Sequence, residues 1–503
     1  MDSDKLKEQK DPKQEVIKII LSLLNSRKFN EAKKKIDKEI INFPKSSILF
    51  NILGAILSEQ DQLEDAIINY KKAIKLNSNY AQAHNNLGTA LHKLGKINEA
   101  VTQYKNAIDL KKDFPESLNN LGSAIIDLKK SKEAISYLEK ALIIKPDYTE
   151  AYNNLGKAYQ NSGDKIKAVE NFQKAINIDP NYADSYYNLG SLLSDLNRFQ
   201  EALDNYKKAI KLKSNNEKYY NNLGNLLNTL GRFDEATEAY NTSIKIKPDY
   251  AKAYSNLLLN LNYKTDFDIN LYLSIAKKFS SSCRKNKKKI SFNYNYEKEP
   301  KKLRIGFLSA DFGNHPGGFF TLSTLRELRK KNFELISYAT TDRRDEFSHH
   351  FKPLFSKWNL VEKKKDEEIV KQIVMDRVHI LIDAQGHSSK NRLSVFFHKP
   401  APIQASWLAQ GSLGIEEIDY FIGSPHITPK VEEDHYVEKI LRLPNISQCF
   451  TAPDFDVKIN SLPAIKNNFI TFGCINKVSK INDDVVSLWS KILISISNSK
   501  LLL

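Results

Sequence analysis

Two histidine-bearing loops hold the residue types in this chain that could do chemistry. His315 lies in the stretch SADFGNHPGG after one apolar run, and His387 ends the stretch DAQGH after another. Histidine exchanges a proton near neutral pH, and the carboxylate of Asp383, four residues before His387, could orient its ring. We therefore take His315, Asp383 and His387 as candidate catalytic residues. The alternatives are that His315 caps the next helix and that the other two brace their loop.

The elements around these loops alternate between strands and helices. Apolar runs predict strands and amphipathic stretches predict helices, in the chain order strand 303–308, helix 322–330, strand 333–339, helix 366–375 and strand 378–382. This alternation indicates a parallel α/β domain, whose ligand crevice lies at the carboxyl ends of the strands. Both histidine loops fall on that edge.

A repeat of 34 residues precedes the α/β region. Its glycines are Gly54, Gly88, Gly122, Gly156, Gly190 and Gly224, and alanines recur in phase from Ala66 to Ala236. The apolar pattern gives each unit two amphipathic helices, which predicts an α-solenoid. With its N-N-L-G and D-P-N-Y-A stretches, the region 47–259 resembles the tetratricopeptide repeat family. Residues 1–46 keep the register at Ala32 but have Ile20 for glycine, so we expect a divergent capping repeat.

One polar column in the repeats stands two residues before each glycine position. It consists of Asn86, Asn120, Asn154, Asn188, Asn222 and Asn256. Side-chain amides repeated in this way could hydrogen-bond the main chain of an extended peptide with little demand on its sequence. We expect a peptide-binding groove. The alternative is that these asparagines brace neighbouring repeats or solvate the surface.

Four long stretches resemble the SPINDLY and O-linked N-acetylglucosamine transferase family. They are RIGFLSADFGNHP, VHILIDAQGH, NRLSVFFHKPAPIQASWL and FITFGCINKVSK, in that order. The resemblance implies tetratricopeptide repeats followed by a two-lobed GT-B glycosyltransferase domain. It therefore places a helical linker at 260–300, an amino-terminal Rossmann-like catalytic lobe at 301–465 and the beginning of a second, nucleotide-sugar-binding lobe at 466–503.

The resemblance implies transfer of N-acetylglucosamine from UDP-N-acetylglucosamine to Ser or Thr of proteins guided by the repeats; some members use GDP-fucose. The family's loop histidine maps onto His315 and its donor-phosphate lysine onto Lys480, with Asn476 and Lys477 in the same segment. Such a transfer needs a group that relieves the acceptor hydroxyl of its proton and cations that offset charge on the leaving diphosphate. We expect no metal and no cofactor besides the donor substrate.

The chain departs from the family pattern in two places. After Leu408 it reads AQGSLG, where most members have a glycine-tyrosine-proline loop, and Lys477 stands where vertebrate-type members have glutamine. Acceptor, sugar and base preference are therefore open. We also expect the second lobe to be truncated after Leu503, with an incomplete donor site, because only two strands and one helix are predicted there. The competing hypothesis is a non-catalytic peptide-binding scaffold with a vestigial transferase lobe.

Composition favours an intracellular protein. The chain has 503 residues, with 76 Lys plus Arg against 60 Asp plus Glu, and its net charge is +16. The lysines are spread among acidic residues, so we expect no nucleic-acid partner. Three widely spaced cysteines fit a reducing compartment and argue against structural zinc. No apolar run approaches the roughly 20 residues of a membrane span, so we expect a cytoplasmic protein without a membrane partner.

Overall fold

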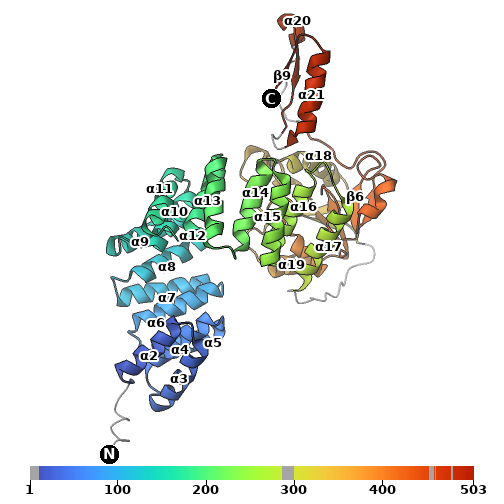
Figure 1. Cartoon of the computed structure of the whole chain (residues 1–503). Coiled ribbons are helices and arrows are strands. Elements are labelled where there is room, and N and C mark those ends of the chain that lie inside the picture. Colours follow the sequence, from blue (N-terminus) through green and yellow to red (C-terminus); the bar gives the residue numbers. More distant parts are fainter. Residues whose placement is uncertain (1–10, 286–299, 453–457, 459, 477–479) are drawn as a thin grey trace, which may run out of the picture. The chain divides into compact units, whose positions relative to one another are not determined.

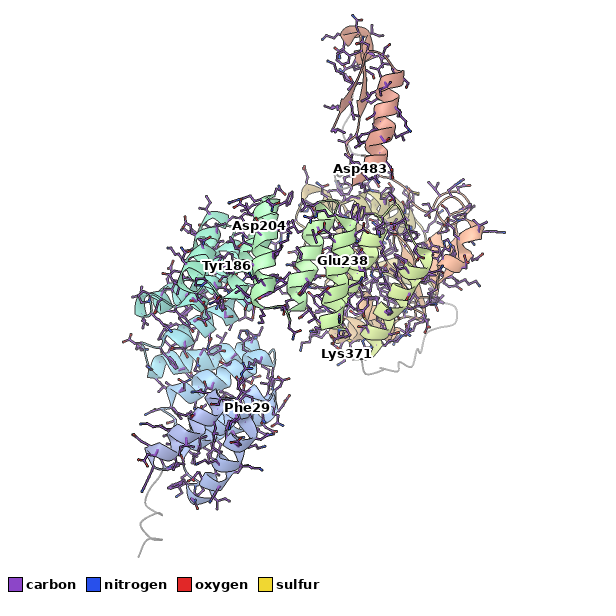
Figure 2. The ribbon with its side chains drawn as sticks, viewed as in Figure 1. Phe29, Tyr186, Asp204, Glu238, Lys371 and Asp483 are labelled. Carbon is purple, nitrogen blue, oxygen red and sulfur yellow. The ribbon has the colours of Figure 1, made fainter. Side chains whose placement is uncertain are left out.

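The structure is a computed structural model that describes residues 11–285, 300–452, 458, 460–476 and 480–503. The chain forms two compact units, Met1–Ser214 and Asn215–Leu503. Figure 2 shows the side chains of both, with Tyr186 on α12 of the first and Glu238 on α15 of the second.

The first unit is a stack of helix pairs that follows the chain from α2 to α13 (Figure 1). Its helices are α2 (Gln14–Asn25), α3 (Phe29–Asn42), α4 (Ser47–Glu59), α5 (Leu63–Leu76), α6 (Ala81–Lys93), α7 (Ile97–Leu110), α8 (Pro115–Asp127), α9 (Ser131–Ile144), α10 (Thr149–Ser162), α11 (Lys165–Ile178), α12 (Ala183–Asp195) and α13 (Phe199–Leu212). The repeat ladder therefore appears as the stacked tetratricopeptide helix pairs that its spacing predicts.

The ladder glycines let the two helices of a pair come close. A Cβ atom added to Gly88 would lie 2.7 Å from Cε1 of Tyr104, and one added to Gly156 would lie 2.7 Å from Cδ1 of Phe172. These ring side chains are themselves buried. The glycine is thus a socket for the ring of the following helix, because any larger residue would displace that ring.

The second unit begins with the helices α14 (Glu217–Thr229), α15 (Phe233–Ile246), α16 (Ala251–Leu261) and α17 (Ile269–Lys285). Gly224 and Tyr240 repeat the glycine socket here. On α17, Ala276 lies against Gly414 so closely that a Cβ at Gly414 would be 2.6 Å from its carbonyl carbon. Helix α17 therefore packs directly on the loop of residues 408–415.

Residues 303–442 form a seven-stranded parallel sheet in the order β3-β2-β1-β4-β5-β6-β7, as far as the structure describes the chain. The strands are β1 (Leu303–Ser309), β2 (Phe333–Ala339), β3 (Lys357–Leu360), β4 (Ile380–Asp383), β5 (Ile403–Trp407), β6 (Tyr420–Gly423) and β7 (Lys439–Arg442). Helices α18 (Pro316–Lys330) and α19 (Asp366–Met375) follow β1 and β3. Short 3-10 helices occupy Glu346–His350, Lys352–Leu354, Leu393–His398 and Lys430–His435.

The core of this domain is apolar and aromatic. Phe307 on β1, Leu325 on α18 and Trp407 on β5 are buried in it together. This packing fixes the carboxyl ends of β1, β4 and β5, from which the candidate site residues extend.

The last described segment forms its own small sheet, in which β8 (Ile470–Gly473) pairs in parallel with β9 (Ser499–Leu502). Helices α20 (Pro463–Asn467) and α21 (Asp483–Ser495) accompany it, and Figure 2 marks Asp483 at the start of α21. None of the residues described after 460 is buried. The strand, helix and strand expected from the sequence are therefore present here, with little apolar surface covered.

Candidate active site

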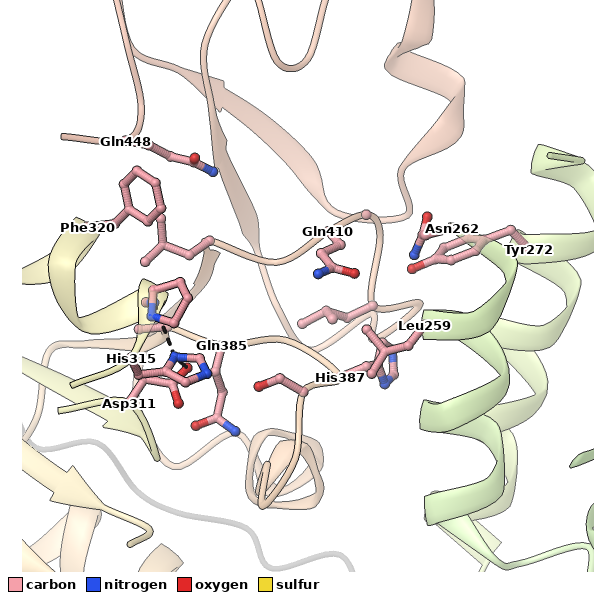
Figure 3. Close-up of a pocket in the computed structure, with 17 residues that line it drawn as sticks. Leu259, Asn262, Tyr272, Asp311, His315, Phe320, Gln385, His387, Gln410 and Gln448 are labelled. Atoms are coloured by element: carbon pink, nitrogen blue, oxygen red, sulfur yellow. Dashed lines mark hydrogen bonds and ion pairs between the residues drawn. The ribbon is translucent and has the colours of Figure 1, made fainter. Parts of the chain in front are cut away.

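A cavity of about 270 Å³ opens at the carboxyl ends of β1, β4 and β5 in the second unit (Figure 3). The loop after β1 contributes His315, the loop after β4 contributes His387, and the loop after β5 contributes Gln410. Leu259 and Tyr272 line it from α16 and α17. The fold thus joins both predicted histidines at one cavity and adds a wall from the helical part of the same unit.

His315 both caps a helix and lines the cavity. Its Nδ1 lies 3.2 Å from the backbone nitrogen of Gly317, at the start of α18, and 3.1 Å from Oδ2 of Asp311. Nδ1 accepts from Gly317 only when it carries no proton, and donates to Asp311 only when it does, so the two bonds exclude each other. When Nδ1–H donates to Asp311, the neutral ring has its free lone pair on Nε2.

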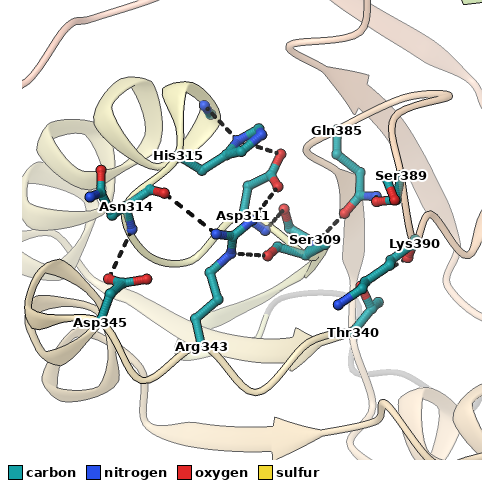
Figure 4. Close-up of polar contacts among 12 residues, drawn as sticks. Ser309, Asp311, Asn314, His315, Thr340, Arg343, Asp345, Gln385, Ser389 and Lys390 are labelled. Carbon is teal, nitrogen blue, oxygen red and sulfur yellow. Dashed lines mark hydrogen bonds and ion pairs between the residues drawn. The ribbon is translucent and has the colours of Figure 1, made fainter. Parts of the chain in front are cut away.

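Arg343 holds Asp311 from the other side (Figure 4). Its guanidinium donates to the carbonyl oxygens of Ala310, at 2.7 Å, and Asn314, at 3.4 Å, and lies 3.5 Å from Oδ1 of Asp311. The side chain of Asp311 is only 8% exposed, so Arg343 places a positive charge beside a largely buried carboxyl group. Arg343 was not among the site residues expected from the sequence. It stands four residues after the end of the predicted strand 333–339, in the loop at the carboxyl end of that strand, and this position was the available signal.

Asp383 stands at the start of the loop that carries His387, and it is not among the residues that line the cavity. Its Oδ2 accepts hydrogen bonds from the backbone N–H of Gly386, at 2.9 Å, and from Oγ of Ser406, at 3.1 Å. Burial raises the pKa of Asp383 to about 7, because little solvent remains to stabilise the charge. These contacts brace the turn at Gly386, whose φ is 61°.

His387 is buried beside the helical wall. Its Nδ1 lies 3.0 Å from Oγ of Ser255 on α16, and its ring meets that of Phe279 on α17 edge-on at 4.9 Å between centroids. Burial lowers the pKa of His387 to about 3, so the ring is neutral at physiological pH. Ser255, rather than Asp383, is the hydrogen-bond partner of this ring, and this contact was not expected from the sequence.

The three donor-site candidates follow β8 and precede α21 in the sequence, and neither Asn476 nor Lys480 lines the cavity. Lys480 and Asn476 are exposed. Lys477 falls outside the described residues.

The asparagine column links successive helix pairs. In five of its members Nδ2 donates to Oδ1 of the asparagine 35 residues earlier: Asn86 to Asn51, Asn120 to Asn85, Asn154 to Asn119, Asn188 to Asn153 and Asn256 to Asn221. The sixth, Asn222, accepts from Asn221, and Tyr187 stands 35 residues before it. The column therefore does brace neighbouring repeats. Its members remain half-buried, so each retains some exposed surface.

Comparison with known families identifies both parts of the chain. Residues 54–129, 115–148 and 149–250 match tetratricopeptide repeat families, and residues 270–462 match the family described as glycosyl transferase family 41. Residues 270–462 form a glycosyl transferase family 41 domain. The family 41 domain contains the whole α/β sheet and every cavity residue except Leu259 and Asn262.

Two individual relatives also match this chain. A Petunia hybrida protein described as a probable UDP-N-acetylglucosamine–peptide N-acetylglucosaminyltransferase SPINDLY is 29% identical over 216 residues, which are 42% of this chain and 23% of that protein. An Arabidopsis thaliana protein described as a probable transferase of the same activity, SEC, is 29% identical over 214 residues, or 40% of this chain and 22% of that protein. The chain therefore spans less than a quarter of the length of these relatives.

A solved structure supports the fold assignment. A mutant of the Thermobaculum terrenum O-GlcNAc transferase superposes with a TM-score of 0.62 at 25% identity, and the match covers 70% of this chain and 67% of that one. The predicted order of tetratricopeptide repeats before a family 41 domain is thus confirmed. Among the described residues, no helix is both long and apolar enough to cross a membrane.

Proposed function

We propose that this chain is a protein O-glycosyltransferase that moves N-acetylglucosamine from UDP-N-acetylglucosamine to Ser or Thr hydroxyls. The observation that carries the proposal is the arrangement of Asp311 and His315 at the cavity. With Nδ1–H bonded to Asp311, Nε2 of His315 is free to accept a proton, which is what an acceptor hydroxyl must lose as it attacks.

In the proposed reaction, the acceptor oxygen forms a bond to the anomeric carbon of the sugar while the bond from that carbon to the diphosphate oxygen breaks. The hydroxyl proton passes to Nε2 of His315, and the negative charge of Asp311 stabilises the imidazolium ion that results. Arg343 acts as a positioning residue, because it fixes the carboxylate of Asp311. Asp383 and His387 support the site without a part in this proton transfer. Asp383 holds the turn at Gly386, and His387 lines the cavity.

The remaining contributions to this function concern the two substrates. We assign Lys480, with Asn476 and Lys477, to the donor diphosphate, because cations there would offset charge on the leaving group. The asparagine column, from Asn86 to Asn256, would contact the main chain of the protein acceptor with the amide surface that bracing leaves exposed.

A transfer assay with the full chain, a radiolabelled donor and a library of Ser- and Thr-containing peptides tests the proposal. We expect His315→Ala to lower kcat by about 10²- to 10⁴-fold, the usual contribution of a general base. His349→Ala is the matched control, because His349 is an exposed histidine of the same domain. UDP-N-acetylglucosamine and GDP-fucose are compared as donors. No transfer by the folded chain, or an unchanged rate in His315→Ala, would refute the proposal.

A further inference from the structure

Ser255 occupies a position that links one repeat to the next in five of the six earlier repeats. At the same register, 34 residues apart, stand Asn51, Asn85, Asn119, Asn153, Tyr187 and Asn221. Asn153, for example, accepts bonds from Asn188 and Ser185 of the following repeat. In the last repeat the residue at this register is Ser255, and its partner is His387 of the family 41 domain.

The hydrogen bond between these residues determines which nitrogen of His387 carries the proton. Ser255 is buried, and within the described residues its Oγ forms a single hydrogen bond, which is with Nδ1 of His387. If Nδ1 carried the proton, both the Ser255 O–H and the Nε2 lone pair would lack partners among the described residues, whereas donation by Ser255 O–H leaves just Nε2–H without one. We therefore assign the donor role to Ser255 O–H and the acceptor role to Nδ1. Because the ring is neutral, its single proton is on Nε2.

Nε2–H of His387 has no hydrogen-bond partner among the described residues. A buried donor without a partner costs about 1–3 kcal/mol, so a site that retains one is suited to a ligand that supplies an acceptor. The same geometry excludes His387 as a general base, because Nε2 already carries a proton and Nδ1 is occupied by Ser255.

We propose that His387 is a substrate-binding residue whose Nε2–H donates to the carbonyl oxygen of an amide, with Ser255 as the positioning residue that fixes its tautomer. The proposal rests on the proposed transferase function and deepens it. Leu259 and Leu413 line the same cavity and would contact the carbon atoms that flank such a carbonyl, while Gln410 offers a further polar group (Figure 3). Nε2 is buried in the structure, so the surrounding side chains must move before an amide can reach it.

Two substrates of the proposed reaction carry this chemistry. One is the acetamido group of N-acetylglucosamine, and the other is the main chain of the acceptor. The cavity volume of about 270 Å³ accommodates either a sugar ring with its acetamido group or a short peptide segment. Leu259 lies three residues after Asn256, so the proposed peptide column and the cavity wall share one helix.

Nuclear magnetic resonance of the full chain with ¹⁵N-labelled histidine tests the tautomer and the ligand. We expect the His387 ring to be protonated at Nε2 and unprotonated at Nδ1 throughout pH 5–8. The Nε2–H signal should shift on addition of N-acetylglucosamine but not glucose, on addition of a Ser-containing peptide, or both, and the pattern identifies the source of the amide. A proton on Nδ1, or no shift with any of these probes, would overturn the proposal and leave His387 a structural residue.

Variants provide a second measurement. His387→Gln keeps a neutral N–H donor, whereas His387→Leu has none, so only the latter should weaken binding of the probe that shifts the signal, by about three- to tenfold. Ser255→Ala should allow the ring proton of His387 to occupy either nitrogen and should weaken binding of the same probe. Ser255→Thr keeps the hydroxyl, so it should restore protonation at Nε2 and the affinity for the probe. Equal affinity in all four variants would contradict the proposal. Binding without glycosyl transfer would refute the proposed function while leaving this inference intact.

Discussion

The bracing role and the proposed peptide-binding role of the asparagine column can be separated by mutation of one hydrogen-bonded pair, Asn154 and Asn119. Asn154 donates to Asn119 at 2.9 Å, and Asn119 is 5% exposed. Asn154→Ala removes that bond and leaves Oδ1 of Asn119 buried without its donor, which costs about 2 kcal/mol. Alanine returns about 0.6 kcal/mol through its higher helix propensity. The net local loss is about 1.4 kcal/mol, which corresponds to about tenfold faster amide exchange.

Hydrogen exchange resolved by helix is the appropriate assay, because repeats open locally and the chain is not expected to unfold in one step. Asn154→Ala should accelerate exchange in α8 and α10. Asn119→Ala should do so less, because the half-buried Nδ2 of Asn154 can turn to water. The double variant should cost about 1 kcal/mol less than the sum. Unchanged exchange in α8 and α10, or a coupling near zero, would refute the bracing role.

The same variants separate the proposed groove from bracing alone. Asn119→Ala leaves the amide of Asn154 in place, so it should preserve peptide affinity, whereas Asn154→Ala should reduce it. Equal peptide affinity in both variants would show that the pair of Asn154 and Asn119 braces the repeats and does not bind the peptide.

Three further predictions concern the glycine sockets, the buried carboxyl and the donor segment. Gly88→Ala should lower stability in α6 and α7 by up to about 2 kcal/mol despite its better helix propensity, because a Cβ would meet Tyr104 at 2.7 Å. Gly190→Ala, with 3.0 Å to Tyr206, should cost less in the same exchange measurement. Asp383 is protonated up to about pH 7 when folded but only to about pH 3.8 when unfolded, so its contribution to the free energy of unfolding is full below pH 3.8 and lost as pH rises to 7. Denaturant unfolding at pH 4–8 should therefore show that the free energy of unfolding of the wild type falls, relative to that of Asp383→Asn, by at most about 4 kcal/mol. If the free energies of the two proteins changed in parallel with pH, the raised pKa of Asp383 would be contradicted. Lys480→Met should weaken binding of UDP in a calorimetric titration, and the exposed Lys466→Met should not; equal affinity would remove Lys480 from the donor site.

Regular spacing made most of the fold predictable. The 34-residue period locates the helix pairs, because one residue type must recur wherever the same helix crossing recurs. Strands β1 and β2 were predicted because they are seven-residue apolar runs. Strands β3, β6 and β7 have four residues each, which is too short for a clear periodicity, and β3 and β7 also mix polar with apolar side chains.

The candidate site was predictable only in part. His315 and His387 could be found because each follows a strand, and parallel strands end at a common edge. Arg343 and Ser255 could not be paired with their partners, because the partners lie 32 and 132 residues away in sequence and meet only through tertiary packing. The roles of Asp383 and His387 likewise depend on burial, which a four-residue spacing does not reveal.

The glycine sockets also bear on how the chain folds. Each socket joins residues 16 positions apart, such as Gly88 and Tyr104, whereas the sheet must pair β1 with β4 across 75 positions, as between Ile305 and Ile380. Closing a short loop costs less entropy than closing a long one, and low contact order speeds folding. The amino-terminal repeats are therefore expected to fold early, while the ribosome is still producing the sheet, and the family 41 domain is expected to complete its fold later.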